Sequence, residues 1–235
     1  MTRWERAQLA ITLLAIDPQR LGGLVIRARA GPAQAEMLAA VQLLDIPTVK
    51  LQHHMTIEVL NGDIDLTASL AGHQLVTRKS IFDCIPSLFV LPMAERCAPQ
   101  FSARICQALE VGLGHGLIAL DEGAEEGDSL PAALADRLAF NVILDDLALQ
   151  DLSSITLPRS VEKIRTEVRG VTLPAELMEE AVTLAASLGI SSLRAPLLLG
   201  YAAQAHAALH LRDEVTDEDL KVAVMLVYPH RATRL

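Results

Sequence analysis

The sequence is poor in aromatic residues and in positive charge, and each shortage excludes a class of protein. Only 3% of the 235 residues are aromatic, so the chain lacks the series of rings on which single-stranded bases stack. Lysine and arginine number 20 against 29 aspartates and glutamates, and the net charge is −9. This balance excludes a general nucleic-acid binder, because phosphates must be neutralised by clustered cations. The apolar interior must be built mainly from Ala, Leu, Val and Ile, which favours packed helices over a β-sandwich.

Cysteines and long apolar runs are also scarce. Cys84, Cys97 and Cys106 have spacings that match neither a zinc site nor a disulfide framework, which is typical of reduced thiols in a cytoplasmic protein. No uncharged run reaches the roughly 18 to 20 residues of a membrane span, and the apolar run at residues 7–16 lacks a small-residue cleavage site. We therefore expect neither a membrane span nor a signal peptide. The mean hydropathy of +0.33 nevertheless predicts that some apolar surface faces a partner.

Strands alternate with helices over the first two thirds of the chain. Short apolar, β-branched runs predict buried strands, and helical periodicity predicts helices between them. This alternation predicts an α/β fold with a parallel sheet covered on both faces. The predicted strands lie at residues 22–28, 48–52, 87–91, 116–120 and 140–146, and the predicted helices at residues 4–16, 33–44, 64–72 and 98–111.

The pattern becomes entirely helical after about residue 157. Thr216 and Asp219 have the spacing of a capping box, and Pro229 is expected to end the last helix. We predict an α/β domain over residues 1–157 and a small all-α domain over residues 158–235. The acidic loop at residues 121–129 is expected to be solvated.

The segment LVIRARAGPAQAEML has the layout of a nucleotide phosphate loop without the residues that bind phosphate. Such a loop has the pattern G-x-x-x-x-G-K-[ST], in which backbone N–H groups and the lysine hold the phosphates and the hydroxyl binds Mg²⁺. Here Pro32 lacks a donor, Gln34 replaces the lysine, and Ala35 offers no oxygen to a metal. The strand at residues 87–91 also runs into Pro92 and Met93 instead of an Asp-Glu pair. At the pattern positions the chain has Ala28, Arg29, Ala30, Gly31, Pro32, Ala33, Gln34 and Ala35.

The order of these pieces resembles the AAA+ module of magnesium chelatase. The resemblance is carried by the loop, by IDLTASLAG before the buried strand LFVL, by LPAALADRL, and by SLRAPLL and VTDEDLKVAVMLVYPHR in the helical part. The resemblance covers nearly the whole chain. It is more specific to the D-subunit family, in which the ATP motifs are eroded while the layout is retained. The resemblance implies an AAA+ parallel sheet of the phosphate-loop NTPase type followed by a helical lid.

The resemblance also implies partners and a pathway. It implies a platform subunit that does not hydrolyse ATP, assembled in a hetero-oligomeric ring with the ATPase I subunit and working with the porphyrin-binding H subunit. The complex uses ATP and Mg²⁺ to insert Mg²⁺ into protoporphyrin IX in chlorophyll or bacteriochlorophyll biosynthesis, a reaction of the ligase class. Members of the family continue into an integrin-like domain, whereas this sequence stops where the AAA+ module would end.

Two arginines match positions that the family uses at a neighbouring nucleotide. Arg137, in LADRL, matches the arginine finger, and Arg194, in SLRAP, matches the sensor-2 arginine of the lid. The resemblance implies that both reach the ATP of the next subunit, while the loop with Ala28, Gly31 and Gln34 binds none. The residues alone leave simpler roles open: Arg137 can pair with an aspartate nearby, Asp136 or Asp145, and Arg194 can flank its helix.

Other functions remain open on this sequence. An active ATPase with an unusual loop would need Arg29 in place of the lysine and Glu95 in place of the lost carboxylates. An AAA+-derived adaptor of another pathway would keep the fold alone. His206 and His210 lie four residues apart and can share a helix face, but no third zinc ligand is evident. Porphyrin or Mg²⁺ roles for the other histidines have no supporting pattern; these are His53, His54, His73 and His115.

Overall fold

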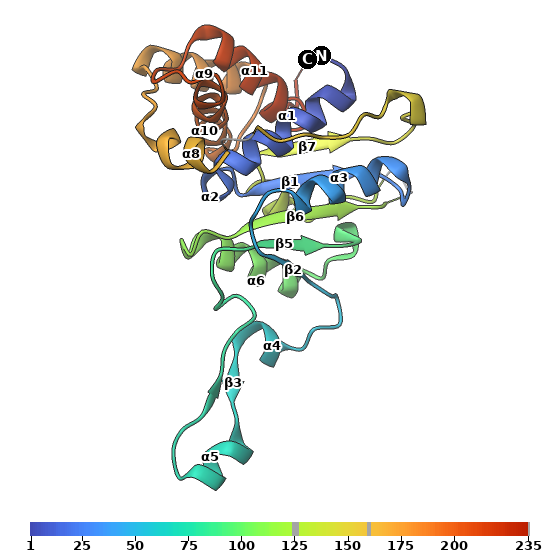
Figure 1. Ribbon diagram of the computed structural model, residues 1–235, viewed down its shortest axis with the longest axis vertical. Helices are drawn as coiled ribbons and strands as arrows, with labels where there is room; N and C mark the ends of the chain where they lie inside the picture. The colour runs from blue at the N-terminus through green and yellow to red at the C-terminus, as the bar shows by residue number, and fades with distance from the viewer. Residues whose placement is uncertain (124–126, 159–160, 235) are drawn as a thin grey trace.

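A computed structural model describes residues 1–123, 127–158 and 161–234 (Figure 1). Its first part alternates strands with helices, as predicted, and its last part is helical. The elements in chain order are α1 (Arg3–Ile16), α2 (Pro18–Leu21), β1 (Gly23–Arg27), α3 (Pro32–Gln42), β2 (Thr48–Lys50), α4 (Ile57–Asn61), β3 (Asp63–Ile64), α5 (Leu66–Gly72), β4 (Thr77–Arg78), β5 (Leu88–Leu91), η1 (Ala94–Arg96), α6 (Pro99–Glu110), β6 (Gly116–Asp121), α7 (Ala132–Ala135), β7 (Phe140–Ile143), η2 (Leu149–Asp151), α8 (Val161–Glu167), η3 (Val168–Gly170), α9 (Ala175–Ser187), α10 (Arg194–Leu209) and α11 (Asp217–Val227).

The main sheet is parallel and has the strand order β2-β5-β6-β1-β7 within the described residues. In the register of the central strand β1, Val25 lies opposite Ala119 of β6 on one side and Asn141 of β7 on the other. Because all five strands run the same way, their carboxyl ends form one edge of the sheet and their amino ends the other. The two edges carry different groups, and this separation organises the site described below.

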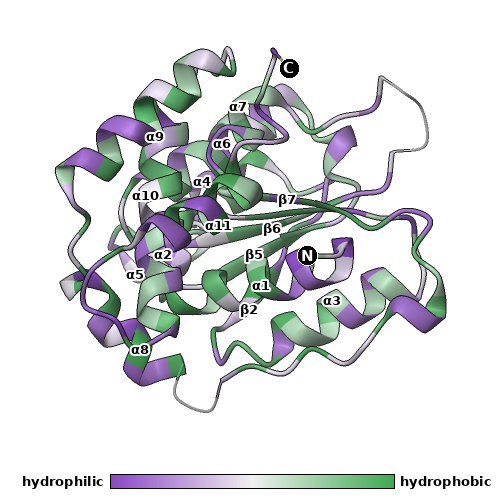
Figure 2. Ribbon diagram, turned by 90° about the horizontal axis from the view of Figure 1, so that it is seen from above, coloured by the Kyte–Doolittle hydropathy of each residue, from purple (hydrophilic) through white to green (hydrophobic). Residues whose placement is uncertain are grey.

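Both faces of the sheet are covered, as the sequence predicted. Alternate residues of β1 pack into different cores: Leu24 and Ile26 join the cluster that contains α1, α3 and the last helices, whereas Val25 joins the cluster that contains α6. All three side chains are almost completely buried. This is the two-residue period of a strand with apolar layers on each side. Figure 2 shows the apolar strands between these two helical layers.

The helices α8 to α11 form the helical part, and α10 packs against both α11 and α1. The predicted capping box is confirmed: Thr216 and Asp219 bond reciprocally at the start of α11. That helix ends at Val227, two residues before Pro229. The predicted domain boundary after residue 157 adjoins residues 159–160, which lie outside the described residues, and it stays a prediction. Residues 124–126 of the acidic loop lie outside them as well.

The helix predicted at residues 64–72 is largely confirmed and ends at Gly72 as expected, but it lies in a projecting arm, residues 57–78. The helix α5 covers only part of that segment, and Ile64 instead lies in the two-stranded antiparallel ladder β3-β4. Gly62 turns the chain into this ladder with φ of 76°, where a side chain would collide with the Arg78 carbonyl. The arm extends away from the sheet (Figure 1) and carries exposed leucines, among them Leu66 and Leu70. Apolar surface is thus concentrated here.

Two further predictions concern cysteines and membrane spans. Cys97 and Cys106 are buried, Cys84 is half-buried, and all three thiols are free. Burial raises the pKa of the Cys97 thiol to about 11, with the neighbouring Cys106 adding to the effect. No helix of the described residues combines the length and the apolar character needed to cross a membrane.

Candidate functional site

The loop after β1 has the predicted layout of strand, turn and helix, but the side chain at its lysine position is hydrogen-bonded within the protein. Gly31 caps α3 with extended backbone, and Pro32 occupies the first helical position, where it contributes no N–H. The side chain of Gln34, at the lysine position, is 8% exposed, and its Nε2 donates to the Ala28 carbonyl at 3.2 Å. The same Nε2 donates to Glu122 at 3.2 Å. The amide at the lysine position therefore closes the loop and does not point toward a ligand.

Two aspartates, an arginine and four leucines line the hollow beside this loop. The hollow has a volume of about 350 Å³ and is lined by residues 28–33 together with Asp145 and Asp146. The Asp145 carboxylate accepts from the Arg29 backbone N–H at 3.2 Å. Arg27, the last residue of β1, pairs with the buried Asp121 at 3.2 Å. Of the ionic side chains that line the hollow, Asp145 and Asp146 are negative and Arg29 is positive, so the lining opposes a polyphosphate only weakly.

The strand-end carboxylates are replaced by a different acidic residue. Beyond β5, Glu95 has a side chain that is only 4% exposed, and it accepts from the Glu122 backbone N–H at 3.1 Å. Glu122 in turn bonds Gln34, so Glu95 lies within the network of the loop. An atypical ATPase would thus have one acidic residue, Glu95, connected to the loop. Arg29, which would have to replace the lysine, lines the hollow, but the position of the metal-binding hydroxyl is the exposed Ala35.

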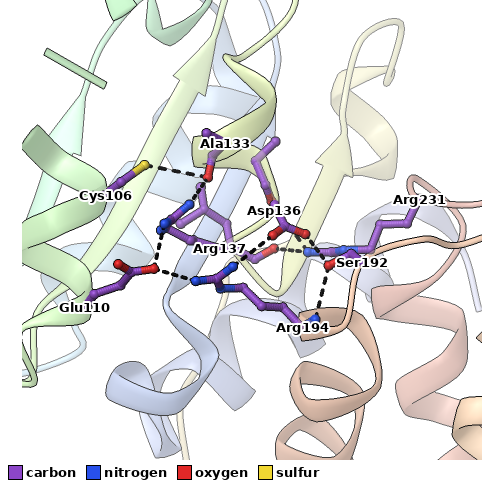
Figure 3. Close-up of polar contacts among 10 residues, drawn as sticks. Cys106, Glu110, Ala133, Asp136, Arg137, Ser192, Arg194 and Arg231 are labelled. Atoms are coloured by element: carbon purple, nitrogen blue, oxygen red, sulfur yellow. Dashed lines mark hydrogen bonds and ion pairs between the residues drawn. The ribbon is translucent and has the colours of Figure 1, made fainter. Parts of the chain in front are cut away.

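The two arginines singled out in the sequence lie together, and one carboxylate oxygen holds them (Figure 3). Oε1 of Glu110, at the end of α6, accepts from Nη2 of Arg137 at 2.6 Å and also from Nη2 of Arg194. Arg137 lies between α7 and β7, whereas Arg194 begins the lid helix α10. A second bond, from Arg137 to the Ala133 carbonyl at 2.6 Å, fixes its guanidinium from the other side. The simpler pairing considered for Arg137 names the wrong partner, because the carboxylate it contacts is that of Glu110.

Asp136 orients the second arginine of this cluster. Its carboxylate accepts from Arg194 at 3.4 Å and from the Ser192 hydroxyl. That hydroxyl also accepts from the Arg194 backbone N–H at 3.2 Å, so Arg194 both begins its helix and faces the cluster. Arg137 is 19% exposed and Arg194 is 46% exposed, which leaves the pair accessible from solvent. We call Glu110, Asp136, Arg137 and Arg194 the arginine cluster.

Two close contacts fix the backbone around Arg137. Gly22, just before β1, has φ of 70°, and a Cβ there would lie 2.2 Å from the Arg137 carbonyl oxygen. Arg231, near the end of the chain, donates to the Leu138 carbonyl at 2.6 Å and to the Ala139 carbonyl at 3.2 Å. Burial lowers the pKa of its guanidinium to about 10. Sequence reasoning missed both residues, because their partners are distant in the chain.

The loop and the arginine cluster occupy opposite edges of the sheet. Ala28 follows the carboxyl end of β1, whereas Gly22, in contact with Arg137, precedes its amino end. Six residue steps of about 3.3 Å lead from Gly22 to Ala28, which separates the two by roughly 20 Å. Glu110 lies at the end of α6, which leads back to the amino end of β6. The arginine cluster is therefore directed away from this chain's own loop.

The histidine pair belongs to a helix cap. His206 Nδ1 lies 2.6 Å from Oδ1 of the fully buried Asp219, and His210 completes a group whose ligand atoms lie within 4.8 Å of one another. Asp219 is thus the third candidate ligand that the sequence did not reveal. Its oxygens already accept from Thr216 and from the Arg212 guanidinium, whose charge opposes a metal cation. Burial alone would raise the pKa of the Asp219 carboxyl, but the bonds from Thr216 and His206 outweigh it and lower that pKa.

His115 has a structural role. Its ring is buried, with Nδ1 accepting from the Ser87 N–H at 3.3 Å and Nε2 lying 2.9 Å from the Phe82 carbonyl oxygen. His53 contacts the Pro92 carbonyl at 2.7 Å, and His73 lies at the end of α5 in the arm. These histidines lie in different parts of the fold, as their sequence positions predicted.

Comparisons with known proteins agree with this architecture. Residues 178–235 match the family model of the AAA lid domain. The fold is similar to that of an inferred ATPase from Cytophaga hutchinsonii, with a TM-score of 0.69, 16% identity, and coverage of 97% of this chain and 85% of that one. At 16% sequence identity, this similarity is evidence for a shared fold alone.

Two sequence relatives are much more similar. The chain is 42% identical to the magnesium-chelatase 60 kDa subunit of Cereibacter sphaeroides and 39% identical to that of Rhodobacter capsulatus, over 97% and 98% of this chain. It spans 41% of the length of each relative. These matches confirm the resemblance drawn from the motifs. The chain is thus an AAA-type α/β unit with an AAA lid domain, similar along nearly all of its length to part of the magnesium-chelatase 60 kDa subunits.

Proposed function

We propose that this chain is a platform module of magnesium chelatase that does not hydrolyse ATP itself. It assembles with an AAA+ ATPase, the I subunit, and contributes to ATP-dependent insertion of Mg²⁺ into protoporphyrin IX held by the H subunit. The pathway rests on the similarity to the 60 kDa subunits. Within the complex the chain supplies Arg137 and Arg194 to the nucleotide of a neighbouring subunit.

One observation carries the trans role: the arginine cluster and the chain's own loop lie at opposite ends of β1. Nucleotides bind beyond the carboxyl ends of strands in open α/β sheets. Arg137 lies at the amino ends, so it cannot serve a nucleotide bound to its own loop. A neighbour whose loop faces the amino edge would receive both guanidiniums at once. The bonding of Gln34 back to Ala28 supports the other half of the proposal, that this loop holds no phosphate.

The test is the substitution Arg137→Ala in the reconstituted complex. An arginine finger supplied in trans contributes roughly 10³- to 10⁵-fold to turnover, so we expect ATP hydrolysis by the partner to fall by at least about 10³-fold. Arg104→Ala is the matched control, because Arg104 is a half-buried arginine of α6 bonded to Asn61 and Gln107, outside the arginine cluster. Unchanged turnover for Arg137→Ala, in a complex whose composition is verified by sedimentation, would contradict the trans role.

The pathway needs a separate test, because an adaptor in another pathway would share this fold. Affinity-tagged chain should recover both an AAA+ ATPase with an intact phosphate loop and a porphyrin-binding subunit. Recovery of an ATPase without chelation activity in the reconstituted mixture would favour the adaptor. Magnesium insertion is followed by the change in porphyrin fluorescence.

A further inference from the structure

Arg137 and Arg194 converge on one anionic oxygen, although they come from different parts of the fold. Oε1 of Glu110 accepts from both guanidiniums (Figure 3). Arginine binds carboxylate and phosphate oxygens in the same way, through charged N–H donors. The two side chains therefore form an anion seat, and a side chain of the same molecule fills it.

The side chain in the seat is poorly held by anything except the arginines. Glu110 is the last residue of α6, where the negative end of the helix dipole disfavours a carboxylate. Its side chain is 48% exposed, so water can replace the protein contacts when it leaves. Asp136 differs, since the Ser192 hydroxyl anchors it and its side chain is only 29% exposed. Of the two carboxylates in the cluster, Glu110 is the one that can exchange.

We propose that Glu110 is an exchangeable internal anion, which occupies the seat between Arg137 and Arg194 and is displaced by the phosphate oxygens of a polyphosphate. Until displacement, Glu110 keeps the guanidiniums together and limits capture of free polyphosphate from solution. This inference rests on the proposed function in one respect: the physiological polyphosphate is the nucleotide of a neighbouring subunit.

The first experiment uses inorganic tripolyphosphate and the purified chain. Glu110→Gln keeps the side-chain size and removes its charge. We expect it to bind tripolyphosphate roughly tenfold more tightly than the wild type at low salt, because one partly screened repulsion and one competing ion pair are lost. The matched control is Glu167→Gln, which changes the net charge equally and breaks a surface pair with Lys163 at 3.8 Å. The gain should shrink at high salt.

The location of the gain is tested with double variants. In a Glu110→Gln background, both Arg194→Gln and Arg137→Gln should remove the gain, while urea midpoints measured in parallel confirm that each variant is folded. The proposal is overturned if Glu110→Gln and Glu167→Gln bind equally, or if the gain persists without the arginines. The latter result would place the anion at another site.

The reconstituted complex separates this inference from the proposed function. If Glu110→Gln strengthens tripolyphosphate binding but Arg137→Ala leaves the partner's ATP turnover unchanged, the seat exists and the trans role fails. If Arg137→Ala lowers turnover but Glu110→Gln has no effect on tripolyphosphate binding, the trans role stands and the exchange is wrong.

Discussion

The two ends of β1 carry opposite kinds of polar chemistry. At the carboxyl end the loop is closed by its own bonds, with Gln34 donating to Ala28 and carboxylates such as Asp145 around it. At the amino end two guanidiniums, Arg137 and Arg194, lie side by side and remain accessible. The first end lacks the lysine and the hydroxyl of a phosphate-binding loop, whereas the second presents two guanidiniums.

This difference separates two roles that an ATPase subunit usually combines. A subunit needs its loop to bind its own nucleotide, and it needs its arginines to act on a neighbour's nucleotide. In this chain the residues of the first set are missing, and the proposed function assigns Arg137 and Arg194 to the second set. The loop keeps its backbone layout because β1 and α3 are part of the core, where Leu24 and Met37 are fully buried. Packing therefore preserves the form of the loop without its ligands.

The largest expected effect compares a glycine from each end of the strand. Gly22→Ala forces a side chain into the backbone of Arg137 at a positive φ, so we expect unfolding to become easier by about 3 kcal/mol or more. Gly31→Ala meets its nearest atom at 3.7 Å and extended backbone, so its cost should stay below about 1 kcal/mol. Urea denaturation of both variants measures the difference. Equal destabilisation would show that the amino end is not held more rigidly.

Acid should destabilise the fold through His230, the neighbour of Arg231 in the chain. Burial, aided by the charge of Arg231, lowers the pKa of His230 to about 3. Arg3 and Arg6 of α1 line the same cavity as this ring. The unfolded chain therefore binds a proton that the folded chain excludes, and stability that is complete above pH 6.5 falls as the pH drops toward 3. This group contributes about 1.4 kcal/mol per pH unit at most.

The substitution His230→Gln checks this contribution. The fall in unfolding free energy between pH 7 and pH 5 should be smaller in His230→Gln than in the wild type. Some fall will remain, because burial also lowers the pKa of His206. An identical pH dependence in the two proteins would mean that His230 is protonated without cost in the folded state.

The smallest expected effect concerns the loop itself. The purified chain should show no heat of Mg-ATP binding up to millimolar nucleotide. Gln34→Lys should not restore binding, because Ala35 still lacks a metal ligand and Asp145 still faces the hollow. Calorimetric titration of both proteins is the measurement. Micromolar binding of Mg-ATP by the wild type would contradict the conclusion that the loop end of β1 holds no phosphate, and it would favour the atypical ATPase.

Much of the fold was predictable because its signals are local. The strands appear as short β-branched runs, and the cap of α11 follows from two residues three positions apart. The ladder of the arm was missed, since it pairs only Asp63 and Ile64 with Arg78 and Thr77 across the intervening helix α5 and has no apolar alternation. Glu110 was missed because it meets Arg137 and Arg194 across 27 and 84 residues.

The sequence by itself determined that the loop lacks its ligands and that Arg137 and Arg194 are present, because both are matters of residue type at a motif position. Only the tertiary structure decided that the arginines share one carboxylate and lie at the opposite end of β1 from the loop. A side chain's neighbours across the sheet depend on strand order and on how the lid docks, and neither is written in any short stretch of sequence.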